Sequence, residues 1–499
     1  MRDGFYIARV IEQLEDVNLL PAIVFRSARS QCDEDVEIAG SNRNLELPAA
    51  HREELIKTIK KVVSDYEMDA ELIRSHPHYY SLITSGVGAH HAGQLLMWRL
   101  LLEELMSKGL LRVLVATGTV AAGVDFPART VVITAHSKRG ADGFRVLTSS
   151  EFQQMSGRAG RRGKDTVGFC VAVPSQFCDA RSLLKIAHRP PEPLVSVYFP
   201  SASTVLNLLR YRNVDGLRYT IEKSLASFGD LKNAKILKEQ ALDLSELLPK
   251  DIKEILFKFQ TNQEKKEIVE FIDPPEHLVS NIGKEKRNTL KKVRRLVREA
   301  KDLETRQLSL LDSALQGLSA LGYLEDTHLS EKGHWAANLC TSLVLEMAEV
   351  IESGLFSNPN VDTLIAVVAS IAADSHRPYL PTKTLVLNKQ QETVIRGILE
   401  KISMLNMPGV SSVNEFNQGA AYTALTWSKT ENWQGFRSLL LFTGVAEGDV
   451  ARLITQTAEQ LNQITRLNET HPQLALKAEE AKKLLLRPPL SDGINLEPN

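Results

Sequence analysis

The sequence predicts three kinds of unit in succession: an α/β domain on a mostly parallel sheet, a winged helix with a helical insertion, and an all-α C-terminal bundle. Up to about residue 188, short apolar runs alternate with helical patterns, which is typical of parallel strands covered by helices on both faces. Beyond that residue almost every periodic segment is helical. The 499 residues also exceed one hydrophobic core, since domains usually hold roughly 100 to 200 residues.

Four short apolar runs are expected to be strands of the first domain. They lie at residues 21–29, 112–117, 130–134 and 166–173. Helical periodicity occupies residues 5–17 before them and residues 94–107 between them. Ligands of such sheets gather beyond the carboxyl ends of the strands. We therefore expect chemistry in the glycine-rich stretches after Thr117 and around Gly157.

The proline-rich run at 188–193 predicts a domain boundary, because proline removes a backbone donor and restricts the residue before it. Two helical segments beyond it, the second ending in a small hairpin pattern, fit a winged helix interrupted by a charged insertion. The predicted units are an α/β domain at 1–188, a connector and winged-helix start at 189–229, a helical insertion at 230–307, the rest of the winged helix at 308–340, a C-terminal helical domain at 341–485 and a disordered tail at 486–499.

The composition excludes several classes of protein. With 43% hydrophobic and 24% charged residues it is that of a soluble globular protein. No apolar run approaches the roughly 18 residues of a membrane span, and acidic residues stand where a signal peptide would be apolar, so we expect a cytoplasmic protein without a membrane partner. The net charge of −1 means that any nucleic-acid contact must be local. Four scattered cysteines favour reduced thiols.

Residues 151–163 (EFQQMSGRAGRRG) carry the strongest chemical signal, because three glycines interleave with three arginines. Glycine permits close backbone approach, and arginine supplies a permanent, forked charge. Positive charge on the oxygens of a migrating phosphoryl group can be worth roughly 10³ to 10⁵ in rate. Arg158 and Arg161 are three residues apart and could point at one phosphate. The alternative interpretation is a solvated basic turn.

This segment resembles the sixth helicase motif of superkiller-type, exosome-associated DExH RNA helicases of superfamily 2. The resemblance implies a RecA-like fold for the first domain. It also implies that Gln154 orients the catalytic water. Arg158 and Arg161 would then act as arginine fingers on the γ-phosphate of ATP, held by another motor domain.

Residues 116–127 (ATGTVAAGVDFP) are similar to the fifth motif, in which hydroxyls and backbone amides grip RNA phosphates and an acid approaches the nucleotide sugar. The family more often has an acid at Gly118 and asparagine at Asp125. The nucleotide contacts that the resemblance implies are Gly123, Asp125, Gly157, Arg158 and Arg161.

Two further segments resemble the family in the same order. Residues 24–29 look like its fourth motif, and residues 86–93 look like a loop before a helix that flanks the RNA track. The implied RNA contacts are Ser27, Arg29, His91, Gly93, Thr117, Thr119 and Arg452. A metal cluster is the rival explanation for His76, His78, His90 and His91. No carboxylate or thiolate neighbour in the sequence completes such a set, so no metal site is predicted.

The C-terminal part resembles the family by pattern over residues 421–427 and 444–453. A helix there would act as a ratchet, with Asp449 as its cap. Its polar face would present Arg452, Gln456 and Glu459, unless that face is merely solvated. Residues 284–298 form a basic amphipathic segment at the position of the family's arch. This segment contacts either RNA, a partner or only solvent.

A complete motor also needs a P-loop and an acidic strand end for Mg²⁺, and neither pattern occurs in these residues. The resemblance therefore implies the C-terminal half of an ATP-dependent RNA helicase, a hydrolase. ATP and Mg²⁺ would require a first RecA-like domain, in cis or in trans. The chain alone is expected neither to hydrolyse ATP nor to unwind RNA. The implied partners are the single-stranded 3′ region of RNA, with DNA as the alternative, and an RNA-degradation protein. A non-catalytic nucleic-acid-binding or regulatory protein is the second hypothesis.

Overall fold

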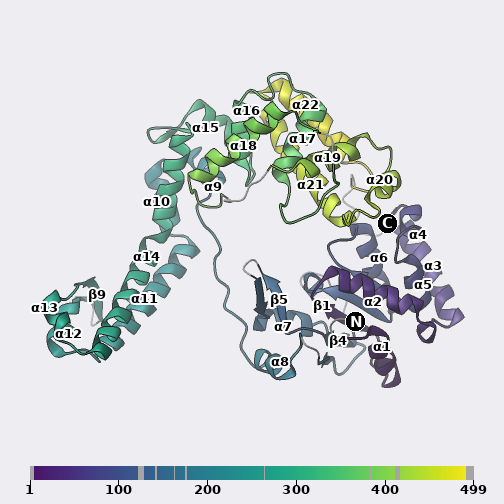
Figure 1. Ribbon diagram of the computed structural model, residues 1–499, viewed down its shortest axis with the longest axis horizontal. Helices are drawn as coiled ribbons and strands as arrows, with labels where there is room; N and C mark the ends of the chain where they lie inside the picture. The colour runs from purple at the N-terminus through teal and green to yellow at the C-terminus, as the bar shows by residue number, and fades with distance from the viewer. Residues whose placement is uncertain are drawn as a thin grey trace.

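The computed structural model describes residues 5–121, 128–140, 143–161, 163–174, 177–262, 265–382, 385–410 and 416–490. Figure 1 shows a sheet domain, an extended connector, a projecting helical arm and a C-terminal helical domain that returns to the sheet domain. Among the described residues, no helix has the length and apolar character that a membrane crossing requires.

The first domain is built on a five-stranded sheet in which every pairing is parallel. Its order is β2-β3-β1-β4-β7. The strands are β1 (Ala22–Arg26), β2 (Val87–His90), β3 (Val113–Thr117), β4 (Thr130–Ile133) and β7 (Phe169–Ala172). The predicted parallel sheet is therefore confirmed, whereas the interpretation of residues 86–93 as a loop is wrong because they contain β2.

Helices cover both faces of this sheet, as predicted. Ile23 and Phe25 of β1 face a core shared with one set of helices, and Val24 between them faces the other core. One face carries α1 (Ile7–Asp16) and α2 (Arg29–Ser41). The other carries α3 (Ala49–Asp65), α4 (Ala70–Arg74), α5 (Tyr79–Ser85), α6 (Leu96–Ser107), α7 (Ser149–Ser156) and α8 (Ala180–Ala187). Burial on both faces explains the continuous apolar runs of β1, β3 and β4.

A small antiparallel hairpin, β5 (Ser137–Gly140) and β6 (Gly143–Val146), stands between β4 and α7 and was not predicted. Its strands are short, and large side chains such as Phe144 are exposed, so no apolar pattern marks it. Short 3-10 helices are η1 (Arg43–Leu45), η2 (Gly118–Ala121) and η3 (Thr465–Leu467).

The connector at 190–200 has no regular secondary structure and is mostly exposed, as its prolines predict. It leads to two short helices and then to the projecting arm seen in Figure 1. These elements are α9 (Ala202–Leu209), α10 (Val214–Glu222), α11 (Leu225–Ser245), α12 (Lys250–Leu256), β8 (Phe257–Asn262), β9 (Lys265–Phe271), α13 (Glu276–Ser280) and α14 (Lys284–Ala320).

The arm corrects the prediction of a purely helical insertion at 230–307. It includes the antiparallel hairpin β8–β9, and α14 runs without a break across the predicted boundary at 307/308. Buried residues recur at helical spacing on both sides of that boundary, from Leu290 to Leu318, so nothing ends the helix there. A two-stranded hairpin, β10 (Leu324–Glu325) and β11 (His328–Leu329), follows α14 and precedes α15 (Glu331–Ala336).

The region from residue 341 onward is largely helical, as predicted. Its helices are α16 (Val344–Glu352), α17 (Val361–Ala372), α18 (Lys389–Met404), α19 (Gln418–Lys429), α20 (Trp433–Leu440), α21 (Glu447–Ile464) and α22 (Pro472–Leu485). Helix α17 is buried from Leu364 to Ile371 and packs against α19, α21 and α22. Residues 491–499 of the predicted tail lie outside the described residues.

Candidate nucleotide and nucleic-acid site

The carboxyl ends of β1 and β3 bring together two of the predicted segments. Arg26 pairs with Thr117 across these parallel strands, so Ser27 and Gly118 leave the sheet side by side. A cavity of about 380 Å³ opens there, and Gln154 of α7 also lines it. The structure thus gathers Ser27 and Gln154 beside the Thr117 segment, as expected for the carboxyl edge of a parallel sheet.

One wall of this cavity is a neutralised carboxylate at the start of α7. The backbone N–H of Thr148 donates to Glu151 (2.9 Å), and the Thr148 hydroxyl accepts from the Glu151 N–H (3.1 Å), which forms a capping box. Arg145 donates to both carboxylate oxygens at 2.8 and 2.6 Å, and Lys138 forms a further ion pair. The hydrogen bonds from Arg145 lower the pKa of Glu151 to about 2. Gln154, one turn further along, is exposed.

The arginine-bearing turn is fixed by backbone contacts. The N–H of Ala128, before β4, donates to the carbonyl of Arg158 (3.0 Å), and the N–H of Gly160 donates to the carbonyl of Ala128 (2.7 Å). Gly160 has a φ of +94°, which favours glycine. A Cβ on Gly168 would lie 2.4 Å from the carbonyl carbon of Ala159, so only glycine allows this approach. The turn is therefore held between the starts of β4 and β7.

The Arg161 side chain is paired with the carboxylate of Asp165. Its Nε and Nη2 donate to the two carboxylate oxygens of Asp165 at 2.8 and 2.9 Å, and its backbone N–H donates to Oδ2 at 3.0 Å. These bonds lower the pKa of Asp165 to about 2. The Arg161 side chain keeps 24% exposure while that of Asp165 keeps 6%. Arg158 is half-buried. The Arg161 guanidinium is therefore already paired within its own domain, whereas the sequence predicted that it is directed at a phosphate.

The position of the turn also corrects the expectation that all chemistry lies beyond the carboxyl ends of the strands. Helix α7 returns from that edge, so Gly157 at its C-cap and Arg158 after it lie beside the amino end of β4. Gly123 and Asp125 lie outside the described residues. Thr117 ends β3, and Thr119 lies in η2.

Two predicted RNA contacts, Arg29 and Gly93, instead meet helix α21 of the C-terminal domain. Nη1 of Arg29 donates to both oxygens of Asp449, at 2.9 and 2.7 Å. The Gly448 N–H donates to the carbonyl of Gly93 at 3.0 Å. His91 is 4% exposed; its Nδ1 accepts from the Gly93 N–H, which leaves Nε2 to donate to Asp33 at 2.8 Å. Arg29 and Gly93 therefore support a domain contact, hereafter the seam, whereas His91 is buried beside Asp33 within the sheet domain.

The seam also corrects the role expected of Asp449. The N-cap of α21 is Ala446, which makes no side-chain cap, whereas Asp449 accepts from Arg29 and lies 3.7 Å from Nε of Arg377. A second contact comes from Arg437, which donates to the Ser75 hydroxyl at 2.9 Å. Sequence reasoning missed Arg437, because no local pattern links it to a partner 362 residues away.

The remaining polar face of α21 is open. Arg452 is exposed and forms no ion pair with any residue that the structure describes, and Gln456 is half-buried. Glu459 is exposed and accepts from Gln463 at 2.6 Å. The ratchet role of this face stays a prediction.

The histidines have carboxylate neighbours in space that the sequence did not show. Nε2 of His90 lies 2.7 Å from Glu103, and Nε2 of His78 lies 3.6 Å from Asp33. His76 stacks on Trp98 with 3.6 Å between the ring centroids. Within the described part of the chain, no group of three or more His, Cys, Asp or Glu side chains is placed to hold a metal ion.

The five-stranded parallel sheet with helices on both faces fits a RecA-like helicase C-terminal domain. The family model for the helicase conserved C-terminal domain matches residues 86–163, and the model for the DSHCT (NUC185) domain matches residues 326–492. The chain carries both domains, and its homologues are DExH-box and superkiller-type RNA helicases.

Three relatives illustrate the similarity. The chain is 35% identical over 240 residues to the chloroplastic DExH-box ATP-dependent RNA helicase DExH15 of Arabidopsis thaliana, covering 48% of this chain and 20% of the relative. It is 31% identical over 249 residues to superkiller complex protein 2 of Mus musculus, covering 49% and 20%. It is 30% identical over 223 residues to the exosome RNA helicase MTR4 of Mus musculus, covering 44% and 21%. The matched part thus spans about a fifth of the length of these relatives.

Proposed function

We propose that this chain is the C-terminal half of an ATP-dependent RNA helicase that translocates on and unwinds RNA in the cytoplasm. Residues 1–188 would be its second RecA-like motor domain. The observation that carries the proposal is the glycine–arginine turn, which the backbones of Ala128 and Gly168 hold in one position at the end of α7. The names of the similar proteins, several of them ATP-dependent RNA helicases, support it.

The chemistry at this turn would be stabilisation of a transferring γ-phosphate. A phosphate offers Arg161 the same paired oxygens that Asp165 now supplies, so the guanidinium can exchange one for the other. Gln154 and Arg158 stand four residues apart across the end of α7, which would place a water-orienting amide beside a second cation. ATP and its Mg²⁺ would be held by a first motor domain, in cis or in trans.

RNA would run along the carboxyl edge of the sheet, with Ser27, Thr117 and Thr119 as phosphate contacts. Arg452 on α21 would add a contact from the C-terminal domain, since its charge is open. The elements α9, α10, the end of α14 and the hairpin β10–β11 would form the winged helix, and the arm would serve as a short arch. A single-stranded 3′ region is the proposed substrate, and an RNA-degradation protein the proposed partner.

The test is RNA-stimulated ATP hydrolysis by this chain mixed with a protein that supplies the first motor domain. We expect activity in the mixture and none with either protein alone. Arg161→Ala should abolish it, with a loss of about 10³ or more for an arginine finger. Arg181→Ala, which removes an exposed arginine on α8, is the matched control and should be neutral. RNA binding without ATP hydrolysis in any combination would favour the non-catalytic hypothesis.

A further inference from the structure

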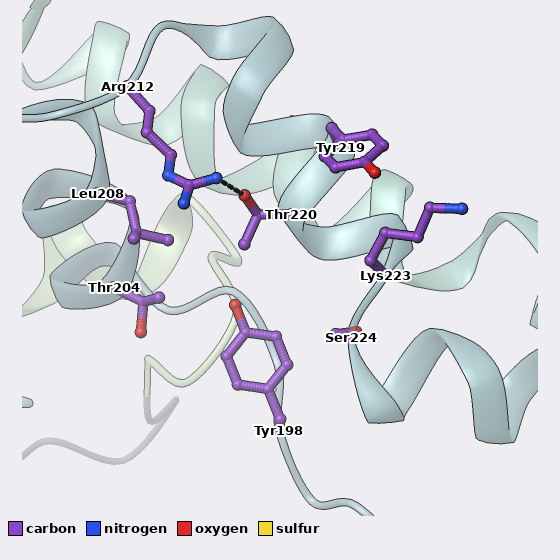
Figure 2. Close-up of a pocket in the computed structure, with 8 residues that line it drawn as sticks. All are labelled: Tyr198, Thr204, Leu208, Arg212, Tyr219, Thr220, Lys223 and Ser224. Atoms are coloured by element: carbon purple, nitrogen blue, oxygen red, sulfur yellow. Dashed lines mark hydrogen bonds between the residues drawn. The ribbon is translucent and has the colours of Figure 1, made fainter.

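A second hollow lies where the connector meets the first helices beyond it, away from the helicase motifs (Figure 2). Its volume is about 560 Å³. Tyr198 comes from the connector, Leu208 from α9, Arg212 from the turn after it, Thr220 from α10, and Lys223 from the end of α10. None of the residues that line this hollow was assigned above to nucleotide or RNA binding.

Two aromatic rings border the hollow. Tyr198 is half-buried, and burial raises the pKa of its phenol. Tyr219 of α10 is 61% exposed. Figure 2 shows Tyr198 and Arg212 pointing toward the middle of the hollow from opposite sides, with Tyr219 along its rim. Aromatic rings at the surface are platforms on which unpaired bases stack.

The charge of the hollow is positive. Arg212 donates through Nη1 to the Thr220 hydroxyl (2.6 Å), which orients its guanidinium and leaves its other N–H groups available. Nζ of Lys223 lies 5.7 Å from the centroid of the Tyr219 ring. Neither cation pairs with a carboxylate that the structure describes, and no carboxylate is among the described residues that line the hollow.

We propose that this hollow binds single-stranded RNA, with bases on Tyr198 and Tyr219 and phosphates at Arg212 and Lys223. The inference rests on the proposed function and adds to it an RNA contact outside the helicase motifs. Its charge and its hydroxyl-bearing lining favour a polyanion over a protein segment, because lysine is depleted at protein interfaces. A duplex does not fit the proposal, since its bases are already stacked inside the helix.

The affinity test uses the full chain and a fluorescent single-stranded oligouridylate, followed by anisotropy. Tyr219→Ala should weaken binding about ten-fold, the loss expected when one base no longer stacks. Tyr80→Ala is the matched control, because Tyr80 on α5 is 65% exposed and lies outside both sites. Equal affinity of the Tyr219 variant and the control would overturn the proposal.

A salt titration tests the phosphate contacts independently. The double variant Arg212→Gln/Lys223→Gln should flatten the dependence of log affinity on log salt by about 1.4, since each single-strand phosphate contact contributes about 0.7. An unchanged slope would overturn the proposed phosphate contacts. Both side chains are exposed, so the variants should fold, and circular dichroism checks this.

Two further measurements separate this proposal from the previous one. If Thr117→Ala weakens RNA binding while the hollow variants do not, only the second site fails. If the unmodified chain does not bind the oligonucleotide, both proposals fail.

The affinity for blunt duplex RNA should be insensitive to Tyr219→Ala. An equal loss of affinity for duplex and single strand would contradict a single-strand site. Sedimentation that shows a dimer separated by Tyr219→Ala would assign the hollow to a second copy instead.

Discussion

Arg29 and Asp449 form an ion pair between the sheet domain and the C-terminal helical domain, with Nη1 donating to both carboxylate oxygens. Asp449 is 6% exposed and Arg29 25% on their side chains. The pair holds the start of α2 against the start of α21.

The two halves of this pair should respond unequally to substitution. Arg29→Gln leaves a nearly buried carboxylate whose remaining partner, Arg377, is 3.7 Å away, and should weaken the seam by about 2 kcal/mol. Asp449→Asn should cost less, because Arg29 can turn toward solvent. Native-state hydrogen exchange in the first turns of α2 and α21 measures the opening of the seam. Equal effects of the two variants would contradict this explanation.

A methyl group at Gly448 should also open the seam. A Cβ there would lie 2.4 Å from the carbonyl oxygen of Ala92 and 2.7 Å from that of Gln94, and backbone atoms cannot give way cheaply. Gly448→Ala should therefore speed exchange in α21 without disturbing α17. Gly229→Ala on α11 meets nothing within 4 Å and is the matched control. That change should stabilise its helix by up to about 1 kcal/mol.

The ion pair of Arg161 and Asp165 predicts that part of the stability of the folded chain is lost in acid. Arg161→Gln should raise the pKa of the Asp165 carboxyl from about 2 toward its ordinary value, because the donating guanidinium is gone. The folded-state pKa lies below the unfolded one, so the pair contributes fully above about pH 4, and its contribution is lost as the pH falls toward 2.

Carbon-13 NMR of the carboxyl group measures the Asp165 pKa directly, and acid unfolding measures the linked stability. Arg181→Gln removes an exposed arginine and should change neither. An Asp165 pKa that stays near 2 in the Arg161 variant would assign the shift to the backbone N–H of residue 161 and to the neighbouring Arg129 instead.

Three of the strands that the sequence predicted, β1, β3 and β4, are almost entirely buried, whereas the predicted edge strand β7 is exposed or half-buried. In β1 every residue is buried, so its run is continuous and apolar. Strand β2 escaped detection because it is short and contains Gly88 and His90. Packing explains the glycine at position 88, since a Cβ there would lie 2.6 Å from Leu102 of α6. Local composition cannot show such a constraint, because it arises only when the helix packs on the sheet.

The candidate site, too, could be predicted only in part from the sequence. The glycine–arginine segment was recognisable because its residue types and spacing are local. The partners of its neighbours were not, because Arg29 and Asp449 are 420 residues apart and pair only once both domains are folded. The hydrogen bond of His91 could not be predicted for the same reason, as its partner Asp33 lies on another element.

Two histidines beside the seam, the buried His78 and the half-buried His76, make stability depend on pH. Burial lowers the pKa of His78, against the opposing charge of Asp33, and lowers that of His76 well below its ordinary range. The unfolded chain therefore binds protons near pH 6.5 that the folded chain does not bind. The free energy of unfolding should fall as the pH drops from about 7 to 5. Each histidine can contribute at most about 1.4 kcal/mol per pH unit.

His76→Phe preserves a ring over Trp98 and removes one titrating group, so it should reduce this pH dependence in denaturant unfolding of the sheet domain. His188→Gln, at an exposed position after α8, should leave it unchanged. Because Arg437 and His91 also lower the pKa of His76, Arg437→Gln should weaken the pH dependence in the same direction. A pH dependence that survives the His76 substitution in full would locate the responsible groups elsewhere in the chain.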